Sequence, residues 1–161
     1  MIVKLKPLIE KLMKPDSEKP KSCVEQYKPL QKAISEVKTR YGDARQFMIT
    51  FNKNIQPLVA ANIERAYLGT APTLTLVRNS YNNNVLIMWI IAQLENLNDF
   101  IGVNQKMNIN QMEELAQIIA IDYHFLKVTE LHLFLHRLKA GRYGEFFGNI
   151  DPIIITKALR T

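Results

Sequence analysis

The sequence predicts an all-α fold: a compact helical bundle of about seven helices, or eight with a short piece at 73–80, and a basic, partly detached N-terminal arm. Apolar residues recur at spacings of three and four along most of the chain, which is the period of an amphipathic helix. Polar helix-starting residues and glycines separate these stretches. No run of alternating apolar and polar residues indicates a β-sheet.

Length and composition are those of a soluble globular protein. The 161 residues fit one domain, 47% of them are hydrophobic and 22% are charged. A single cysteine, Cys23, excludes an intrachain disulfide and a multi-cysteine zinc site. The longest apolar run, Val85–Ala92, is far shorter than the roughly 20 residues of a membrane span, and the N-terminus does not resemble a secretory signal. We therefore expect a cytoplasmic protein without membrane association.

The net charge of +6 is unevenly distributed. Residues 1–42 hold ten Lys or Arg and five Asp or Glu, whereas residues 43–161 hold eleven and ten. This contrast predicts a basic N-terminal helical arm and linker over 1–42 and a helical core domain over 43–161. Two interpretations of the arm stay open: it binds an acidic partner such as nucleic acid, or its lysines form a solvated surface.

The arm itself is expected to hold two helices. The first is short, Pro7–Lys14, and the linker Pro15–Ser22 follows it. The second spans Val24–Tyr41, with Pro29 predicted to kink it or to move its start. Its apolar side chains step by three and four at Tyr27, Leu30, Ile34, Val37 and Tyr41. This seam fits either packing on the same domain or a dimer contact.

The core domain begins at a helix boundary. Gly42 is expected to end one helix and Asp43 to cap the next. The helical pattern that follows, Ala44–Leu68, contains Pro57, so it should divide or kink there, and Gly69 should end it.

The most apolar stretch predicts the central helix. We expect Asn84 to cap a helix over Val85–Phe100 that is buried on most faces and ends at Gly102. A short helix over Thr73–Ser80 precedes it. Three further helices are expected to surround it, Asn108–Asp122, Glu130–Ala140 and Pro152–Arg160. Asn108 with Gln111 forms a capping-box pattern, and Thr129 is the expected cap of the second of these helices.

The stretch Lys139–Pro152, KAGRYGEFFGNIDP, is predicted to be the joint between the last two helices. A glycine should end the first helix, and an aspartate followed by proline should start the second. The two adjacent phenylalanines are expected to lock the corner as buried plugs. The predicted structural residues of this joint are Phe134, Gly141, Gly144, Phe146, Phe147, Gly148, Asp151 and Pro152.

No arrangement of residues in the sequence indicates catalysis. There is no nucleophile elbow and no phosphate-binding loop. His132 and His136 have metal-ligand spacing, but Leu133 stands where the metalloprotease pattern needs glutamate, so they are expected to be solvated or partner-facing. We expect no enzymatic activity, no catalytic residue, no cofactor and no metal.

A basic, aromatic patch beside the joint is the candidate contact surface. Arg137, Lys139, Arg142 and Tyr143, with the two histidines, provide cations for phosphates and an aromatic ring for stacking on a base. The same residue types suit a protein partner.

Three segments carry a resemblance to a known family: Ala66–Leu74 (AYLGTAPTL), Leu97–Val103 (LNDFIGV) and Leu133–Leu159 (LFLHRLKAGRYGEFFGNIDPIIITKAL). Together they resemble uncharacterised helical proteins of gut bacteria, their phages and mobile elements. The tail is also loosely similar to phage replicative-helicase loaders. The positions that match the loaders are Phe134, Gly141, Tyr143, Gly144, Phe147, Asp151 and Ile154. This similarity implies a protein that binds a helicase without catalysing a reaction.

Three functions follow as hypotheses. The first is a non-enzymatic adaptor of a phage or mobile element, helicase-loader-like in DNA replication, with a protein partner such as a replicative helicase. The second is a direct DNA- or RNA-binding protein that uses the basic arm and the Arg137–Tyr143 patch. The third is a virion or other structural protein that assembles through the Tyr27–Tyr41 seam, as a dimer for example.

Overall fold

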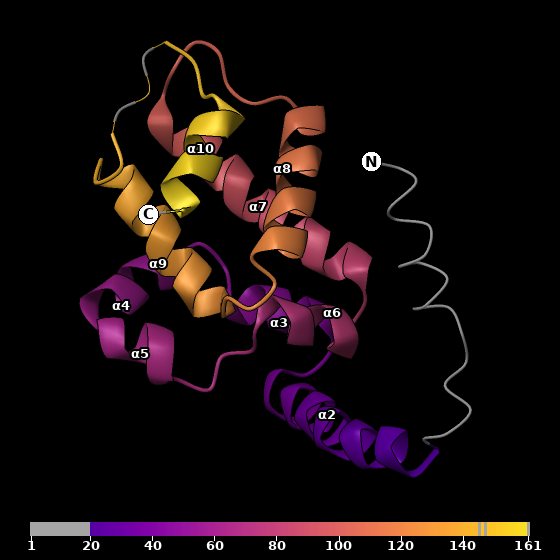
Figure 1. Cartoon of the computed structure of the whole chain (residues 1–161). Coiled ribbons are helices and arrows are strands. Elements are labelled where there is room, and N and C mark those ends of the chain that lie inside the picture. The colour runs from indigo at the N-terminus through magenta and orange to yellow at the C-terminus, as the bar shows by residue number, and fades with distance from the viewer. Residues whose placement is uncertain (1–19, 145, 147, 161) are drawn as a thin grey trace, which may run out of the picture. The chain divides into compact units, whose positions relative to one another are not determined.

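The fold is all-α. The computed structural model describes residues 20–144, 146 and 148–160, and their side chains from residue 28 onward. Within these ranges it contains nine helices and no β-strand, which confirms the predicted all-α class (Figure 1). The predicted number of seven or eight helices was too low, because the Ala44–Leu68 pattern forms three of them. The helices are α2 Pro20–Tyr41, α3 Ala44–Thr50, α4 Ile55–Ala61, α5 Ile63–Leu68, α6 Leu74–Ser80, α7 Asn83–Ile101, α8 Ile109–Asp122, α9 Val128–Lys139 and α10 Pro152–Leu159.

The chain divides into two compact units, Met1–Ala33 and Ile34–Thr161. The described part of the first unit is the start of α2. This helix begins at Pro20, so the prediction of a start at Val24 or later was wrong. Proline suits the first turn, where its missing N–H has no helical partner, and the second proline, Pro29, is exposed inside the helix. The predicted helix Pro7–Lys14 lies outside the described residues.

The last turns of α2 belong to the second unit and contact its core. Val37 is buried, and the ring of Tyr41 lies 5.0 Å from that of Phe51. The C-terminal part of the predicted seam therefore packs within its own unit. Gly42 ends the helix with φ +76°, and Asp43 and Gln46 form a capping box at the start of α3.

The Ala44–Leu68 pattern forms three short helices. The chain leaves helical geometry between α3 and α4 and again at Asn62, whereas Pro57 lies within the first turn of α4. The prediction of a break at Pro57 was therefore wrong. The N–H groups of a first turn have no intrahelical acceptor, so a proline there removes no hydrogen bond.

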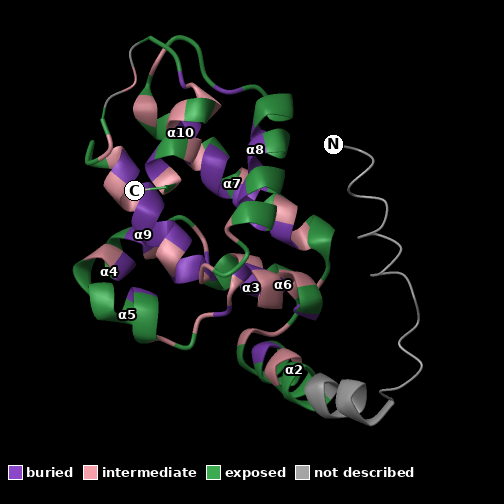
Figure 2. Cartoon of the chain, viewed as in Figure 1, coloured by how far each residue is buried: buried purple, intermediate pink, exposed green. Residues whose placement is uncertain are grey.

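Helix α7 is the centre of the second unit. Its residues Leu86, Trp89, Ile90, Leu94 and Leu97 are buried, and it packs against α6, α8 and α9 (Figure 2). Helix α10 in turn packs on α8. The contacts with α8 and α9 confirm the central position predicted for this helix, whereas α10, which was also predicted to lie beside it, packs on α8. No helix in the described part of the chain is both long and apolar enough to cross a membrane.

Two predicted helix caps are displaced. Asn82, not Asn84, caps α7, because its side chain accepts a hydrogen bond from the Val85 N–H at 2.8 Å. Lys127, not Thr129, precedes α9, and its N–H donates to the Glu130 carboxylate at 2.9 Å. The hydroxyl of Thr129 forms a tertiary hydrogen bond to the Ala66 carbonyl instead.

The joint has the predicted ends. Gly141 follows α9 with φ +77°, a conformation that favours glycine. The Asp151 side chain accepts from the Ile153 N–H at 2.9 Å, and Pro152 is the first residue of α10. Two residues of the joint pair with the backbone of Gln105. The Gln105 N–H donates to the Gly148 carbonyl at 3.2 Å, and the Gln105 carbonyl accepts from the Ile150 N–H at 2.9 Å. These two bonds fix the joint to the loop before α8.

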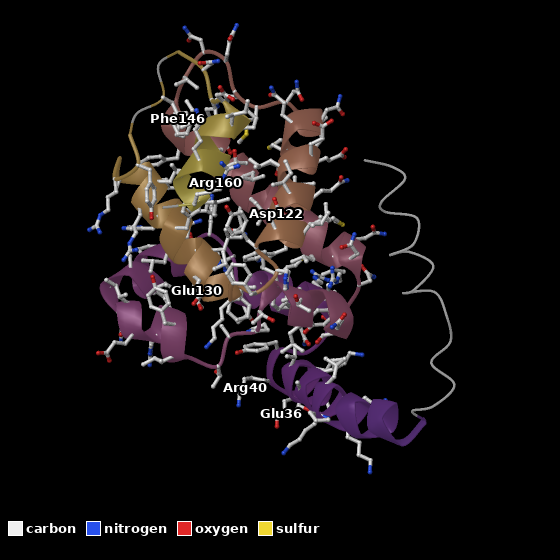
Figure 3. The ribbon with its side chains drawn as sticks, viewed as in Figure 1. Glu36, Arg40, Asp122, Glu130, Phe146 and Arg160 are labelled. Carbon is white, nitrogen blue, oxygen red and sulfur yellow. The ribbon has the colours of Figure 1, made fainter. Side chains whose placement is uncertain are left out.

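Of the two phenylalanines predicted to lock the corner, Phe146 lies within the described residues. Phe146 is half-buried and packs against the main core, and it lies on the loop between α9 and α10 (Figure 3). The prediction for Phe147 falls outside the described residues. The other predicted structural residues, Gly144 and Gly148, have φ values of +106° and +76°, which explains glycine at both turns.

Candidate functional site

A small pocket lies between α5, α9 and α10 and is the candidate site. Its volume is about 200 Å³. The apolar part of its lining consists of Leu126, Leu133, Phe134, Ala158 and Leu159. The remaining lining residues are Tyr67, Glu130, Arg137 and Tyr143. We call these nine residues the joint pocket. Figure 3 labels Glu130 on α9 and Arg160 at the end of α10, directly after the lining residue Leu159.

Hydrogen bonds from the start of α9 hold α5 beside it. The Thr129 hydroxyl donates to the Ala66 carbonyl at 2.8 Å. The Lys127 ammonium donates to the carbonyls of Tyr67 and Gly69 at 2.8 and 2.7 Å. These bonds fix the backbone of α5, so Tyr67 reaches the same pocket as residues more than 60 positions later in the chain. The first and last segments of the family resemblance meet here.

Arg137 and Tyr143 are the two predicted contact residues that line the joint pocket. Arg137 is half-buried, and its guanidinium pairs with no side chain among the described residues. Its carbonyl accepts a hydrogen bond from the Arg142 N–H at 3.1 Å, which closes the end of α9. The Tyr143 ring packs 5.3 Å from that of Phe134. A cation and an aromatic ring are thus presented together.

Lys139 lies in a different environment. Its ammonium donates to Gln56 Oε1 at 2.9 Å and to Asn96 Oδ1, and it stands 5.5 Å from the centre of the Phe100 ring. Partial burial, and then the charge of Lys53, lowers the pKa of Lys139. The ammonium therefore joins α4 and α7 to α9. Arg142 is exposed and does not line the pocket, so the structure does not bring the four predicted contact residues into one cluster.

His132 is a core residue, so its prediction as solvated or partner-facing was wrong. It is fully buried, and its Nε2–H donates to the Phe51 carbonyl at 3.1 Å, since a carbonyl can only accept. The Trp89 indole donates to the same oxygen at 2.9 Å. Burial lowers the pKa of His132 to about 4, which keeps the ring neutral near pH 7. His136 is half-buried.

The structure shows no group of three or more metal-ligating side chains among the described residues. The arrangement in the joint pocket has a different chemistry: apolar walls, two tyrosines, and a guanidinium that lacks a described partner. Such a site can bind an apolar side chain together with an anion.

Several residues of the joint pocket were not predicted from the sequence as contact residues. Tyr67, Leu126, Glu130 and Leu159 were not among the predicted contacts, although three of them are adjacent to predicted helix ends. Only the resemblance over Ala66–Leu74 indicated that the α5 region matters. No local pattern indicates that a residue of α5 will meet α9.

The comparisons with known proteins concern the C-terminal part of the chain. Residues 106–161 match the model of a family of unknown function (DUF6633). No curated protein matches the chain significantly. No solved structure does either. All residues of the joint pocket except Tyr67 lie within the matched range. The last third of the chain, and with it most of the joint pocket, is thus similar to that family.

Proposed function

We propose that this protein is a non-enzymatic adaptor that docks a protein partner at the joint pocket. The observation that carries the proposal is the meeting of Arg137, Tyr67 and Tyr143 in one small pocket. Arginine and tyrosine are the residues, with tryptophan, that most often dominate the energy of protein interfaces. They are most effective where apolar side chains surround them, as Leu133 and Leu159 do in this pocket.

The proposed setting is DNA replication in a phage or mobile element, with a replicative helicase as the partner. Its support is the resemblance of the tail to phage helicase loaders. Two of the matching positions, Phe134 and Tyr143, pack against each other in the joint pocket with their rings tilted. A third, Gly141, and a fourth, Asp151, set the ends of the joint that carries Tyr143. Two of the seven matching residues therefore line the proposed docking surface, and two more set the ends of the segment that carries it.

The test is binding to a purified hexameric replicative helicase from the bacterium that harbours the gene. We expect the full-length protein to co-elute with the helicase in size-exclusion chromatography at micromolar concentrations. Arg137→Ala should weaken the complex at least about tenfold, because a charge-assisted hydrogen bond contributes roughly 1.5–3 kcal/mol. Arg45→Ala is the matched control, since Arg45 is exposed on α3 and lies outside the joint pocket. Absence of any complex would remove the helicase from the proposal.

Direct nucleic-acid binding is the second candidate function. It is favoured by the charge of the first unit, where residues 1–33 hold eight Lys or Arg and four Asp or Glu. Arg142, exposed after α9, adds one cation to the second unit. Phosphate contacts of this kind weaken steeply with salt. A variant without residues 1–33 tests this function.

A further inference from the structure

We infer that the joint pocket recognises a short acidic segment of its partner, with one large apolar side chain in the pocket and a neighbouring carboxylate on Arg137. This inference rests on the proposed adaptor function and specifies the chemistry of the partner. Three observations support it: the size of the pocket, the charge at its wall and the hydrogen bonds that hold its walls in place.

The size of the pocket selects a single side chain. Its volume of about 200 Å³ is below the roughly 300–1,000 Å³ of sites for drug-sized ligands and cofactors. The walls are apolar and aromatic: Leu133, Phe134 and Leu159, with Tyr67 and Tyr143. A leucine, methionine or aromatic side chain fits both the volume and the chemistry, whereas a nucleotide is too large and too polar.

The charge at the wall selects a carboxylate. The guanidinium of Arg137 is half-buried and has no partner among the described side chains, so a bound anion would supply one. Residues 134–161, which include the second half of α9 and all of α10, hold five Lys or Arg and two Asp or Glu, and this net positive charge favours an acidic ligand. Arginine binds a carboxylate through two parallel hydrogen bonds, which fixes the direction of the ligand.

Glu130 favours a carboxylate ligand over a phosphate ligand. It lines the same pocket, and its side chain already accepts from the Lys127 N–H at 2.9 Å. Its negative charge opposes a dianionic phosphate group more strongly than a single carboxylate. The wall thus carries one cation and one anion, which suits a peptide that contains both an acidic group and N–H donors. This argues for a peptide over a nucleic acid.

The walls are held in place before any ligand arrives. Thr129 and Lys127 fix the backbone of α5 through three hydrogen bonds, and Gly141 and Asp151 fix the ends of the joint that carries Tyr143. A pocket with fixed walls costs little conformational entropy when it binds. A short peptide segment can therefore bind without folding of the protein around it.

A selection from a displayed random-peptide library tests the inference on the full-length protein. We expect the recovered peptides to share an acidic residue within two positions of a large apolar residue. Synthetic copies of them, titrated by fluorescence anisotropy, should bind Arg137→Ala at least about tenfold more weakly than the wild type. Arg137→Glu should reverse the preference and recover basic peptides. Arg45→Ala should bind like the wild type, because Arg45 is exposed and outside the pocket.

The control for folding is a second pocket residue on another helix. Tyr67 is 46% exposed, so Tyr67→Ala should leave the circular-dichroism spectrum unchanged and still weaken the peptides. Recovery of peptides without an acidic–apolar motif, or equal binding by the wild type, Arg137→Ala and Tyr67→Ala, would overturn the inference. Loss of single-stranded oligonucleotide binding in Arg137→Ala, without any recovered peptide, would also overturn it and would identify this surface as a nucleic-acid contact.

The peptide experiment and the helicase experiment can fail separately. If the peptides bind at Arg137 but no helicase complex forms, the pocket chemistry stands and the helicase partner falls. If the helicase binds equally well to the wild type and Arg137→Ala, the proposed docking of the helicase at the joint pocket falls, whereas the pocket chemistry stands or falls with the recovered peptides.

Discussion

The buried polar side chains are the most informative single residues. His132 and Trp89 both donate to the carbonyl of Phe51, the residue at which α3 ends, so one oxygen connects three helices. Lys139 similarly joins α4 and α7 to α9 through Gln56 and Asn96. An unpaired buried polar group costs far more than a paired one, so these contacts specify how the helices are arranged.

His132 makes the stability depend on pH. Its pKa is about 4 in the fold and about 6.5 in an unfolded chain, so between these values the unfolded state binds a proton that the native state does not. Stability from this group is complete above pH 6.5 and falls as the pH drops toward 4, by about 3 kcal/mol in total.

The measurement is the free energy of unfolding by urea from pH 7 to pH 4.5. His132→Gln is the comparison, because its amide can still donate to the Phe51 carbonyl but does not titrate. The difference between the two proteins should shrink as the pH falls. A constant difference across this range would contradict the assignment of a neutral buried imidazole.

Among the elements, the helix ends show how much the sequence could predict. The boundaries at Gly42, Asp43, Asn108, Gly141 and Asp151 are local chemistry, since each depends on residues within four positions, and each is where the sequence predicted it. The caps at Asn84 and Thr129 were predicted wrongly. Three consecutive asparagines, residues 82–84, could each have capped α7, and the cap is Asn82. The Thr129 hydroxyl caps no helix because it donates to the Ala66 carbonyl.

The candidate site was less predictable than the helix ends, because contacts between residues far apart in the sequence assemble it. Arg137 and Tyr143 were found by their type and position, but Tyr67 joins them through bonds between residues 58 to 63 positions apart. Lys139 forms a hydrogen bond to Gln56, 83 positions earlier in the sequence, and His132 forms one to Phe51, 81 positions earlier. Helical periodicity carries no information about such distant pairs.

The cap of α10 can be tested directly. Asp151→Ala removes the acceptor for the Ile153 N–H and should lower the free energy of unfolding by about 1 kcal/mol. Asp122→Ala is the matched control, because Asp122 is exposed at the last position of α8, where a negative charge opposes the helix dipole. That variant should be neutral or slightly more stable. Equal losses in the two variants would contradict a specific role for Asp151.

At the scale of the whole molecule, the two units predict separable properties. Ile34–Thr161 contains the core around α7 and the joint pocket, whereas Met1–Ala33 holds most of the excess positive charge. A variant that begins at residue 34 should lose the helical circular-dichroism signal of residues 20–33, which belong to α2, and should keep its cooperative melting. It should also keep helicase and peptide binding, because the pocket is complete without the first unit.

The same variant decides the nucleic-acid hypothesis. If the basic arm binds phosphates, the full-length protein should bind a single-stranded oligonucleotide with an affinity that falls steeply with salt, and the shortened variant should lose most of that slope. Equal salt slopes for the two proteins would exclude the arm as the contact. No binding by either protein at low salt would exclude the function altogether.

The shared acceptor at Phe51 has an optical consequence. Trp89 is the single tryptophan of the chain, and its ring stands edge-on to His132, with 5.3 Å between the ring centres. Indole fluorescence is quenched more strongly by a protonated imidazole than by a neutral one, and its emission shifts to longer wavelength on contact with water. The chain therefore carries one intrinsic fluorophore at the point where α3, α7 and α9 meet. Its emission reports both the protonation of His132 and the opening of the core, without any added label.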